Sequence, residues 1–586
     1  MTRRHFLGSS LALTAAALAG PAARAAARQG RTRPGAPGWP SAADWAGLDQ
    51  ATHGRLSPVT LPDLADPAIR ALARNPFYLG DQPGLTQSSG WLDAWRSSPS
   101  AYVVAAENAA DVAAAIRFAR AHNLRLAVRG GGHSYLGASN APDSLLVWTR
   151  RMRTVSVHDA FTPRGSKAAP VPAVSLGAGC VWLDAYQAVT TGAGRYVQGG
   201  GCTTVGVAGL VQGGGFGSHS KAYGTAAASL LEAEVVTADG QVHVVNHAQE
   251  PDLFWALKGG GGGTFGVITR LTLATHDLPA TFGGVNLTLH ARSDEAYRRL
   301  IARFVDLYAS SLFNPHWGEQ VRAGPDNRLV VSMVFQGLTP AQARAAWQPL
   351  LDFAKASPAD YEGQDSFNAV AGPARLFWDA DMLQRFAPGA IVPDTHPGAR
   401  AKAFWWTGDG EQAGAYWHAY TSAWLPASLL TPRNQARLVD AWFAASRHWS
   451  AAFHFNKGLA GAPAAALAAA RDTAMNPEVV DAFALAIIAD AGPSLYSGDH
   501  PDPAAAHARA GRVQAAMTAL RAAAPGAGAY VNECDYFQAD WQRAFWGPNY
   551  PRLARVKRRY DPGGLFFVHH GVGSETWSPD GFTRMA

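Results

Sequence analysis

The alternation of apolar and polar positions predicts a β-α-β unit early in the chain. Residues 101–106 form a short apolar run typical of a buried strand, and residues 109–122 repeat apolar positions at helical spacing. A second apolar run at 124–128 leads directly into three consecutive glycines at 130–132. A strand that ends in a glycine-rich turn is the arrangement expected of a ligand-binding loop in an α/β unit.

Short strand patterns continue from residue 145 to about residue 273. Three glycine clusters interrupt them, at 199–201, 213–217 and 259–263. The tract 230–244 alternates in strand fashion and breaks at Asp239-Gly240, a dipeptide typical of hairpin turns. The five glycines of the last cluster could form a flexible linker. Their apolar flanks favour instead a backbone wrapped closely around a ligand.

From about residue 276 the pattern changes to strands that alternate with helices. Strand-like runs at 284–289 and 328–335 alternate with helical runs at 294–309 and 340–354. Aromatic side chains concentrate between residues 404 and 455. The pattern predicts a second domain in which a sheet is covered by helices.

The N-terminus has the pattern of an export leader. Arg3 and Arg4 precede an apolar run at 7–19 and a small-residue cleavage site near Ala25, so residues 1–27 are predicted to be a signal peptide. The paired arginines indicate the twin-arginine export machinery, which carries folded proteins to the periplasm or the exterior. A general secretory leader with incidental arginines is the alternative.

Length and composition limit the other possibilities. A chain of 586 residues exceeds what one core usually supports, so two domains are expected, and residues 28–90 are predicted to be a linker and N-terminal segment. Without the leader arginines Arg3, Arg4 and Arg24, the formal charge falls from +6 to +3, and no Lys/Arg stripe is present. Nucleic acid is therefore not expected as a partner. Beyond the leader no apolar run is long enough to span a bilayer, so no stable membrane association is expected.

Two reactive side chains stand beside glycine-rich turns. His133 follows the glycines at 130–132, and Cys202 follows those at 199–201. Glycines lack Cβ atoms, so the backbone can approach a flat or anionic ligand closely. Imidazole and thiolate are good nucleophiles at neutral pH, and the pair is typical of a double covalent anchor for a flavin. A hydrogen-bonded loop histidine and a buried thiol are the alternatives.

These motifs resemble those of the berberine-bridge-enzyme-like flavoproteins, members of the vanillyl-alcohol-oxidase superfamily. The likeness is specific at 129–134, 200–224, 252–267 and 530–562. It implies an α+β, two-domain PCMH-type FAD-binding fold with a substrate domain of antiparallel sheet covered by helices. The implied regions are an FAD-binding domain at 91–275, a substrate-binding domain at 276–500 and a C-terminal berberine-bridge-like segment at 501–586 that returns to the FAD domain.

The resemblance implies that FAD is held covalently by two side chains. His133 would bond the 8α-methyl group of the flavin, and Cys202 would bond carbon 6 of the same ring. The amides of the first glycine turn and the Ser134 hydroxyl would hold the pyrophosphate, the glycines after Cys202 would pass beside the ring and ribityl chain, and residues 262–267 would line the adenine side. The implied cofactor-binding set is His133, Cys202, Arg129, Gly130, Gly131, Gly132, Ser134, Val205, Gly206, Gly209, Gly213, Gly214, Gly215, Gly262, Gly266 and Val267.

Val205 bears on the electron acceptor. In the family a small residue at this place leaves oxygen access to the flavin, whereas leucine restricts it. Valine therefore favours an oxidase, and a β-branched packing residue is the alternative.

The C-terminal block carries the candidate base. The family pattern Tyr-x-Asn-Tyr-x-Asp reads here Tyr530-Val531-Asn532-Glu533-Cys534-Asp535, so Glu533 replaces the second tyrosine. On an alternating strand Tyr530 and Asn532 would share one face and Glu533 the other. The predicted catalytic set is Tyr530, Asn532 and Glu533, with Tyr530 favoured as the base and Glu533 as the alternative.

The resulting hypothesis is an exported oxidase with bicovalent FAD. It would remove a hydride from a carbon bearing oxygen or nitrogen in an alcohol, sugar or related small molecule, and molecular oxygen would become hydrogen peroxide. One alternative is an FAD-dependent dehydrogenase that uses a quinone or another carrier, and a less favoured one is a secreted carbohydrate-binding protein. No metal is predicted, because His569 and His570 would point to opposite faces of a strand.

Overall fold

The first sheet contains the β-α-β unit that the sequence predicts. The computed structural model describes residues 30–499 and 502–585, so the predicted leader lies outside the described residues. The unit comprises β4 (Tyr102–Ala105), α5 (Ala109–Ala121), β5 (Arg125–Arg129) and β6 (Ser144–Trp148). β6 lies between β4 and β5 and is parallel to both, and β1 (Leu56–Pro58) pairs antiparallel with β4. α5 packs against this sheet through buried Val112, Ile116 and Ala119, the predicted apolar positions.

A second sheet of six strands follows. Its members are β11 (Val242–Val245), β10 (Leu230–Val236), β12 (Val267–Asp277), β8 (Val171–Gly177), β7 (Val155–Phe161) and β9 (Arg195–Val197). β10 and β11 form the predicted hairpin around Asp239-Gly240, where Gly240 has a φ of +77°. The short helices α7 (Val207–Gln212) and α9 (Pro251–Leu257) contribute buried side chains to the core of this part of the chain.

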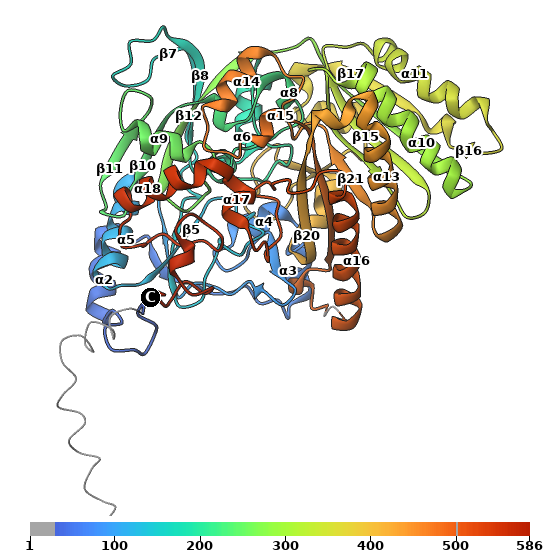
Figure 1. Ribbon diagram of the computed structural model, residues 1–586. Helices are drawn as coiled ribbons and strands as arrows, with labels where there is room; N and C mark the ends of the chain where they lie inside the picture. The colour runs from blue at the N-terminus through green and yellow to red at the C-terminus, as the bar shows by residue number, and fades with distance from the viewer. Residues whose placement is uncertain (1–29, 500–501, 586) are drawn as a thin grey trace, which may run out of the picture.

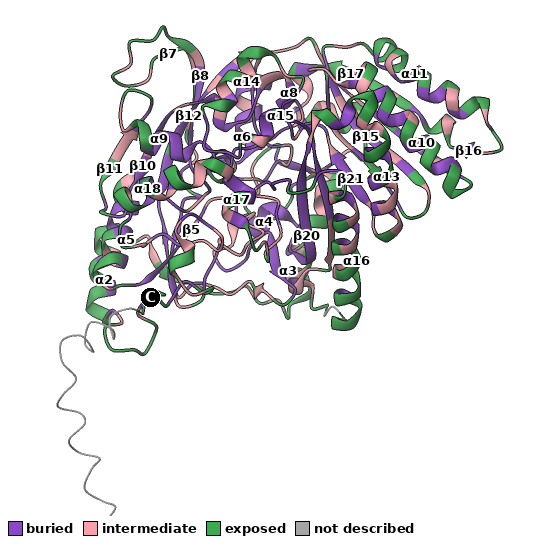
Figure 2. Cartoon of the chain, viewed as in Figure 1, coloured by how far each residue is buried: buried purple, intermediate pink, exposed green. Residues whose placement is uncertain are grey.

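The third sheet has ten strands and forms the other half of the molecule (Figure 1). Its main members are β13 (Thr281–Ala291), β14 (Trp317–Ala323), β15 (Arg328–Gln336), β17 (Asn368–Pro373), β20 (Ala415–Pro426), β21 (Ala451–His454) and β22 (Ala482–Gly492). The helices α10 (Asp294–Leu307), α11 (Pro340–Ala356), α13 (Pro432–His448) and α16 (Pro503–Arg521) lie over it. Their exposed outer faces and the buried strands beneath them are visible in Figure 2. The expected antiparallel sheet covered by helices is confirmed.

The predicted linker and N-terminal segment before residue 91 contains regular structure that packs against the rest of the chain. α2 (Ala42–Ala51) buries Trp45 and Leu48 in the core cluster around α5. β2 (Ser88–Trp91) belongs to the third sheet and pairs parallel with β20, which lies far along the chain. The sequence gives no local sign of such a pairing, because its partner is so distant.

The C-terminal segment spans both halves of the molecule. α16 packs against β20 and α13, whereas α18 (Tyr550–Tyr560) packs against α9. The chain then forms a parallel bridge between Phe566 and Leu126 of β5. After α16 the chain therefore lies against elements of the first half.

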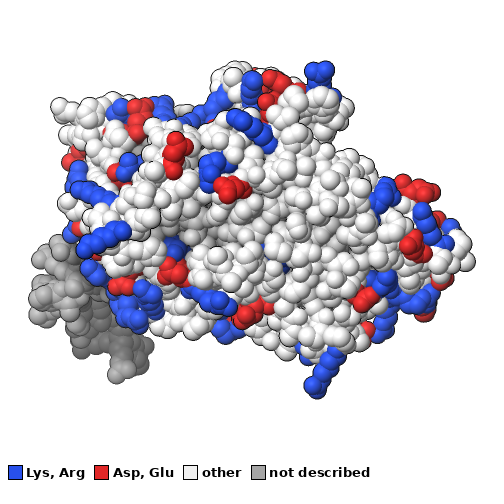
Figure 3. All heavy atoms as spheres, turned by 90° about the horizontal axis from the view of Figure 1, so that it is seen from above, with Lys and Arg blue, Asp and Glu red and all other residues white. Residues whose placement is uncertain are grey.

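Figure 3 shows one face of the molecule, on which Lys and Arg side chains are interspersed with Asp and Glu. Within residues 30–499 and 502–585, no helix combines the length and the apolar character needed to cross a membrane.

Candidate active site

A cavity of about 480 Å³ is enclosed by residues from both halves of the chain. Its first wall comes from the end of β5 and the glycine-rich segments at 200–212 and 261–266. Its second wall comes from β14, β20 and β21 of the third sheet, and the C-terminal segments 530–533 and 566–571 close it. Both predicted flavin anchors, His133 and Cys202, line this one cavity.

The two glycine-rich loops are in backbone contact. A Cβ atom on Gly131 would lie 2.6 Å from the amide nitrogen of Gly206, and a Cβ atom on Gly206 would lie 2.7 Å from that of Gly131. Side chains larger than hydrogen would force the loops apart. This contact places His133 and Cys202 on the same cavity although about seventy residues separate them.

His133 is half-buried in the wall of the cavity. Its Nε2 lies 3.1 Å from Thr204 Oγ1. Burial, assisted by the positive charge of Arg150, lowers the pKa of His133 to about 4. The contact with Thr204 occupies Nε2, so Nδ1 is the ring nitrogen without this partner, and an uncharged imidazole carries one nitrogen lone pair.

Cys202 faces a carboxylate. Its Sγ donates a hydrogen bond to Asp409 Oδ1 over 3.4 Å. Burial and the charge of Asp409 raise the pKa of the Cys202 thiol well above its usual value. Burial also raises the pKa of Asp409, to about 6. The resting sulfur is therefore a thiol.

The backbone around the cavity fits a flat, extended cofactor. A Cβ atom built on Gly209 would have no heavy atom within 4 Å, and one on Gly262 would meet nothing closer than Gly209 at 3.8 Å. These glycines border open space, unlike Gly131 and Gly206. Among the described residues, buried polar atoms of the lining also lack partners, including Gln212 Oε1 and Asn456 Oδ1. Open glycine backbone and unpaired polar atoms suit a group with polar edges such as FAD.

Four predicted cofactor residues do not line the cavity. A Cβ atom on Gly213 would clash with the side chain of Asn532, and one on Gly214 would lie 2.5 Å from Met475 Sδ. Gly215 donates its amide to the Tyr530 hydroxyl over 3.1 Å. Gly213 and Gly215 therefore contact the C-terminal segment, Gly214 contacts Met475, and the predicted role of the three glycines as ring contacts stays a prediction. Val267 begins β12 and packs in the core, so its side chain does not line the cavity.

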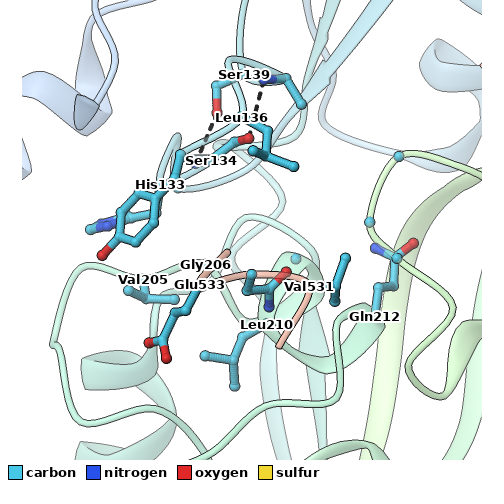
Figure 4. A pocket seen from close by; sticks show the side chains of 18 of the residues that line it. His133, Ser134, Leu136, Ser139, Val205, Gly206, Leu210, Gln212, Val531 and Glu533 are labelled. Atoms are coloured by element: carbon cyan, nitrogen blue, oxygen red, sulfur yellow. Dashed lines mark hydrogen bonds between the residues drawn. The ribbon is translucent and has the colours of Figure 1, made fainter. Parts of the chain in front are cut away.

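Arg129 and Ser134 contribute mainly by holding loops. The Arg129 guanidinium donates to the carbonyl oxygens of Gln82, Pro83 and Leu85 and so holds the segment 82–85. The Ser134 hydroxyl accepts from the Ala138 amide over 3.1 Å. Figure 4 shows Ser134 and Ser139 together on the wall opposite Val205 and Glu533.

The segment that carries Tyr530 and Glu533 is a turn, so the predicted strand was wrong. The Glu533 amide donates to the Tyr530 carbonyl over 2.9 Å, which closes the turn. Both side chains consequently line the cavity.

The turn gives Tyr530 and Glu533 different surroundings. The Tyr530 hydroxyl accepts from Gly215 and from Asn532 Nδ2, at 3.1 and 3.0 Å. Burial and the nearby Glu533 raise the pKa of Tyr530 above its usual range. Lys457 Nζ lies 2.6 Å from both carboxylate oxygens of Glu533. A carboxylate held in an ion pair with a lysine can accept a proton directly, whereas a buried phenol must first lose its own, so the geometry favours Glu533 over Tyr530.

Several cavity residues escaped the sequence analysis. Tyr135 lies with its ring centroid 4.7 Å from that of Trp417 and 5.1 Å from that of Tyr420, and the three form one aromatic wall. Glu319 accepts from Ser218 at 2.5 Å and has a φ of +65°, a backbone strain often found at functional sites. Tyr135 adjoins the recognised motif, and Trp417 and Tyr420 lie in the noted aromatic region, whereas Glu319 has no local signature.

His569 and His570 are stacked, so the predicted opposite orientation was wrong. Their ring centroids are 3.9 Å apart, and His569 also stacks on Tyr536 at 3.8 Å. Within the described residues no group of three His, Cys, Asp or Glu side chains could hold a metal ion. Both histidines line the cavity as part of the C-terminal segment 566–571.

Comparison with known proteins identifies the family. Residues 99–246 match the FAD binding domain family, and residues 529–573 match the family described as berberine and berberine like. VAO615 of Thermothelomyces thermophilus, a VAO-type flavoprotein oxidase, is 30% identical over 95% of this chain and 95% of its own length. The chain belongs to the VAO-type FAD-linked oxidoreductases.

Solved structures agree with this family. The crystal structure of the VAO-type flavoprotein MtVAO615 from Myceliophthora thermophila covers 95% of this chain and 100% of its own, with a TM-score of 0.76 and 28% identity. Glucooligosaccharide oxidase from Acremonium strictum covers 81% of this chain and 92% of its own, with a TM-score of 0.62 and 20% identity, and shows the same fold. The predicted two-domain FAD-binding fold and an FAD-dependent oxidoreductase activity are thus confirmed.

Proposed function

We propose that this VAO-type protein is an exported oxidase that binds FAD through both His133 and Cys202. The observation that carries the proposal is the convergence of His133, Cys202 and the Glu533 carboxylate on one cavity. The glucooligosaccharide oxidase of the same fold is described with a 6-S-cysteinyl, 8α-N1-histidyl FAD, which supports the same two attachments. The paired arginines at 3 and 4 support export in the folded state.

The residues of the cavity divide the chemistry between them. His133 Nδ1 and the Cys202 sulfur would hold the flavin, and bound FAD would supply the hydride acceptor. Glu533 takes the proton from the substrate hydroxyl or amine, and Lys457 holds that carboxylate in place through an ion pair. The aromatic wall of Tyr135, Trp417 and Tyr420 positions a substrate that carries a ring.

The substrate in this proposal is a small alcohol, sugar or related molecule oxidised at a CH–OH or CH–N carbon. Molecular oxygen serves as the acceptor and leaves as hydrogen peroxide. Val205 lines the cavity and supports oxygen access, because it is smaller than leucine.

The deciding experiment is acid denaturation of the purified protein and of three variants. We expect the wild type, His133→Ala and Cys202→Ala to keep FAD on the chain, and the double variant to release it. The intact mass and the colour of the precipitate report the bond. Release of FAD from the acid-denatured wild type would contradict covalent attachment. Substrate oxidation that consumes no oxygen and yields no peroxide would favour the carrier-dependent dehydrogenase.

The Val205→Leu variant tests the electron acceptor. We expect reoxidation of the flavin by oxygen to slow by about tenfold or more, because leucine would narrow the path of oxygen to the flavin. Reduction of the flavin by the substrate uses the same cavity but needs no oxygen. Stopped-flow spectra separate flavin reduction by the substrate from reoxidation by oxygen. The reduction rate provides the internal control and should stay within about twofold of wild type. Equal slowing of both steps would indicate a packing defect instead.

A further inference from the structure

Asp409 lies against the Cys202 thiol. No motif in the sequence links these two residues. Asp409 is on a short 3₁₀ helix, Thr407–Gln412, which follows β19 (Phe404–Trp406) in the second half of the chain. Trp406 Nε1 donates to the Gly201 carbonyl over 3.2 Å. This hydrogen bond joins the 406–409 segment to the residue before Cys202. It therefore helps to keep the Asp409 carboxylate beside the Cys202 thiol.

The carboxylate has no structural partner to explain its burial. Among the described residues, Asp409 Oδ1 accepts from Cys202, while Oδ2 is buried without a hydrogen bond, and no Lys or Arg pairs with it. A buried carboxylate without a cation is costly, and such groups are concentrated at functional sites. Both Asp409 and Cys202 line the cavity.

The surroundings of Cys202 also differ from those of most reactive cysteines. Reactive thiols usually have a cation or a helix N-terminus that stabilises the thiolate. Here the hydrogen-bonded neighbour is an acid, and burial further disfavours the thiolate. A sulfur in this setting needs a base that removes its proton as it attacks.

We propose that Asp409 is the general base for attachment of FAD to Cys202. The inference rests on the bicovalent attachment proposed above. Asp409 Oδ1 takes the thiol proton while the Cys202 sulfur forms a bond to carbon 6 of the flavin ring. The hydrogen displaced from that carbon leaves as a proton, and its two electrons stay in the ring and then pass to molecular oxygen. One cysteine, one FAD and one oxygen molecule thus give the thioether and one hydrogen peroxide.

The test measures the rate at which FAD becomes attached to Cys202. Full-length wild type and Asp409→Asn are produced under riboflavin limitation, mixed with FAD in air and quenched in acid at intervals. Peptide mass spectrometry then measures FAD on the peptide with Cys202 and, separately, on the peptide with His133. We expect Asp409→Asn to modify Cys202 at least about 100-fold more slowly, the usual size of a general-base contribution. Modification of His133 should proceed normally, which also shows that the variant folds and binds FAD.

Two further variants sharpen the result. Asp409→Glu restores a carboxylate and should recover much of the rate at Cys202. Glu411→Gln changes an exposed carboxylate on the same 3₁₀ helix and should match the wild type. Wild-type attachment at Cys202 in Asp409→Asn would overturn the role of Asp409 and leave the proposed function intact. An unmodified Cys202 in the wild type would overturn both, because there would be no bond for Asp409 to assist.

Discussion

Replacing Glu533 by Gln should lower kcat by about 10²–10⁴-fold, the range expected for the loss of a general base. Glutamine has nearly the same shape and can still accept a hydrogen bond from Lys457, which lies 2.6 Å from both carboxylate oxygens. It cannot take up a proton from the substrate. The turn that Tyr530 and Glu533 close should survive, because it depends on a backbone hydrogen bond. Single-turnover reduction of the flavin by a substrate measures the effect directly.

The Tyr530→Phe variant is the matched comparison. Phenylalanine keeps the buried ring but removes the oxygen that accepts from Gly215 and Asn532. The buried Gly215 amide and the half-buried Asn532 amide then lose their partner, so we expect a lower melting temperature and a change in kcat below about tenfold. The opposite pattern, with Tyr530→Phe nearly inactive and Glu533→Gln nearly normal, would restore the tyrosine as the base.

Local patterns in the sequence predicted the parts of the site that depend on local geometry. The β-α-β unit could be predicted because apolar spacing records which face of α5 is buried. His133 and Cys202 could be predicted to act together because glycines without side chains accompany both. The family resemblance then supplied their roles.

Contacts between distant segments could not be predicted in this way. The alternation of residues 530–534 is compatible with a strand, and only the tertiary position of the segment selects a turn. Asp409 meets Cys202 because β19, which precedes it, is placed near Cys202 by the tertiary fold. No spacing in the sequence predicts that two residues 207 positions apart are in contact. The glycines at 213–215 were predicted to lie beside the flavin, yet a sequence does not say whether a missing Cβ atom makes room for a cofactor or for Asn532.

Alanine should have different effects at glycines that contact another loop and at glycines that border the cavity. Gly131→Ala should prevent incorporation of FAD and also destabilise the apoprotein by about 1–3 kcal/mol, the usual cost of overpacking. Its new methyl group would lie 2.6 Å from the Gly206 amide nitrogen, so the two anchor loops must separate. Melting temperatures of the apoproteins and the ratio of FAD to protein measure the two consequences.

Gly209→Ala should separate these consequences, because Gly209 borders the cavity and not another loop. A Cβ atom there has no protein atom within 4 Å, and alanine is the better residue within α7, so the apoprotein should be as stable as the wild type. The methyl group would nevertheless occupy space that the proposed flavin needs, so the FAD content should fall severalfold. A Gly209→Ala protein with full FAD would mean that the cofactor does not pass this glycine. Loss of FAD without loss of stability would instead place the cofactor against α7, because no protein contact has been disturbed.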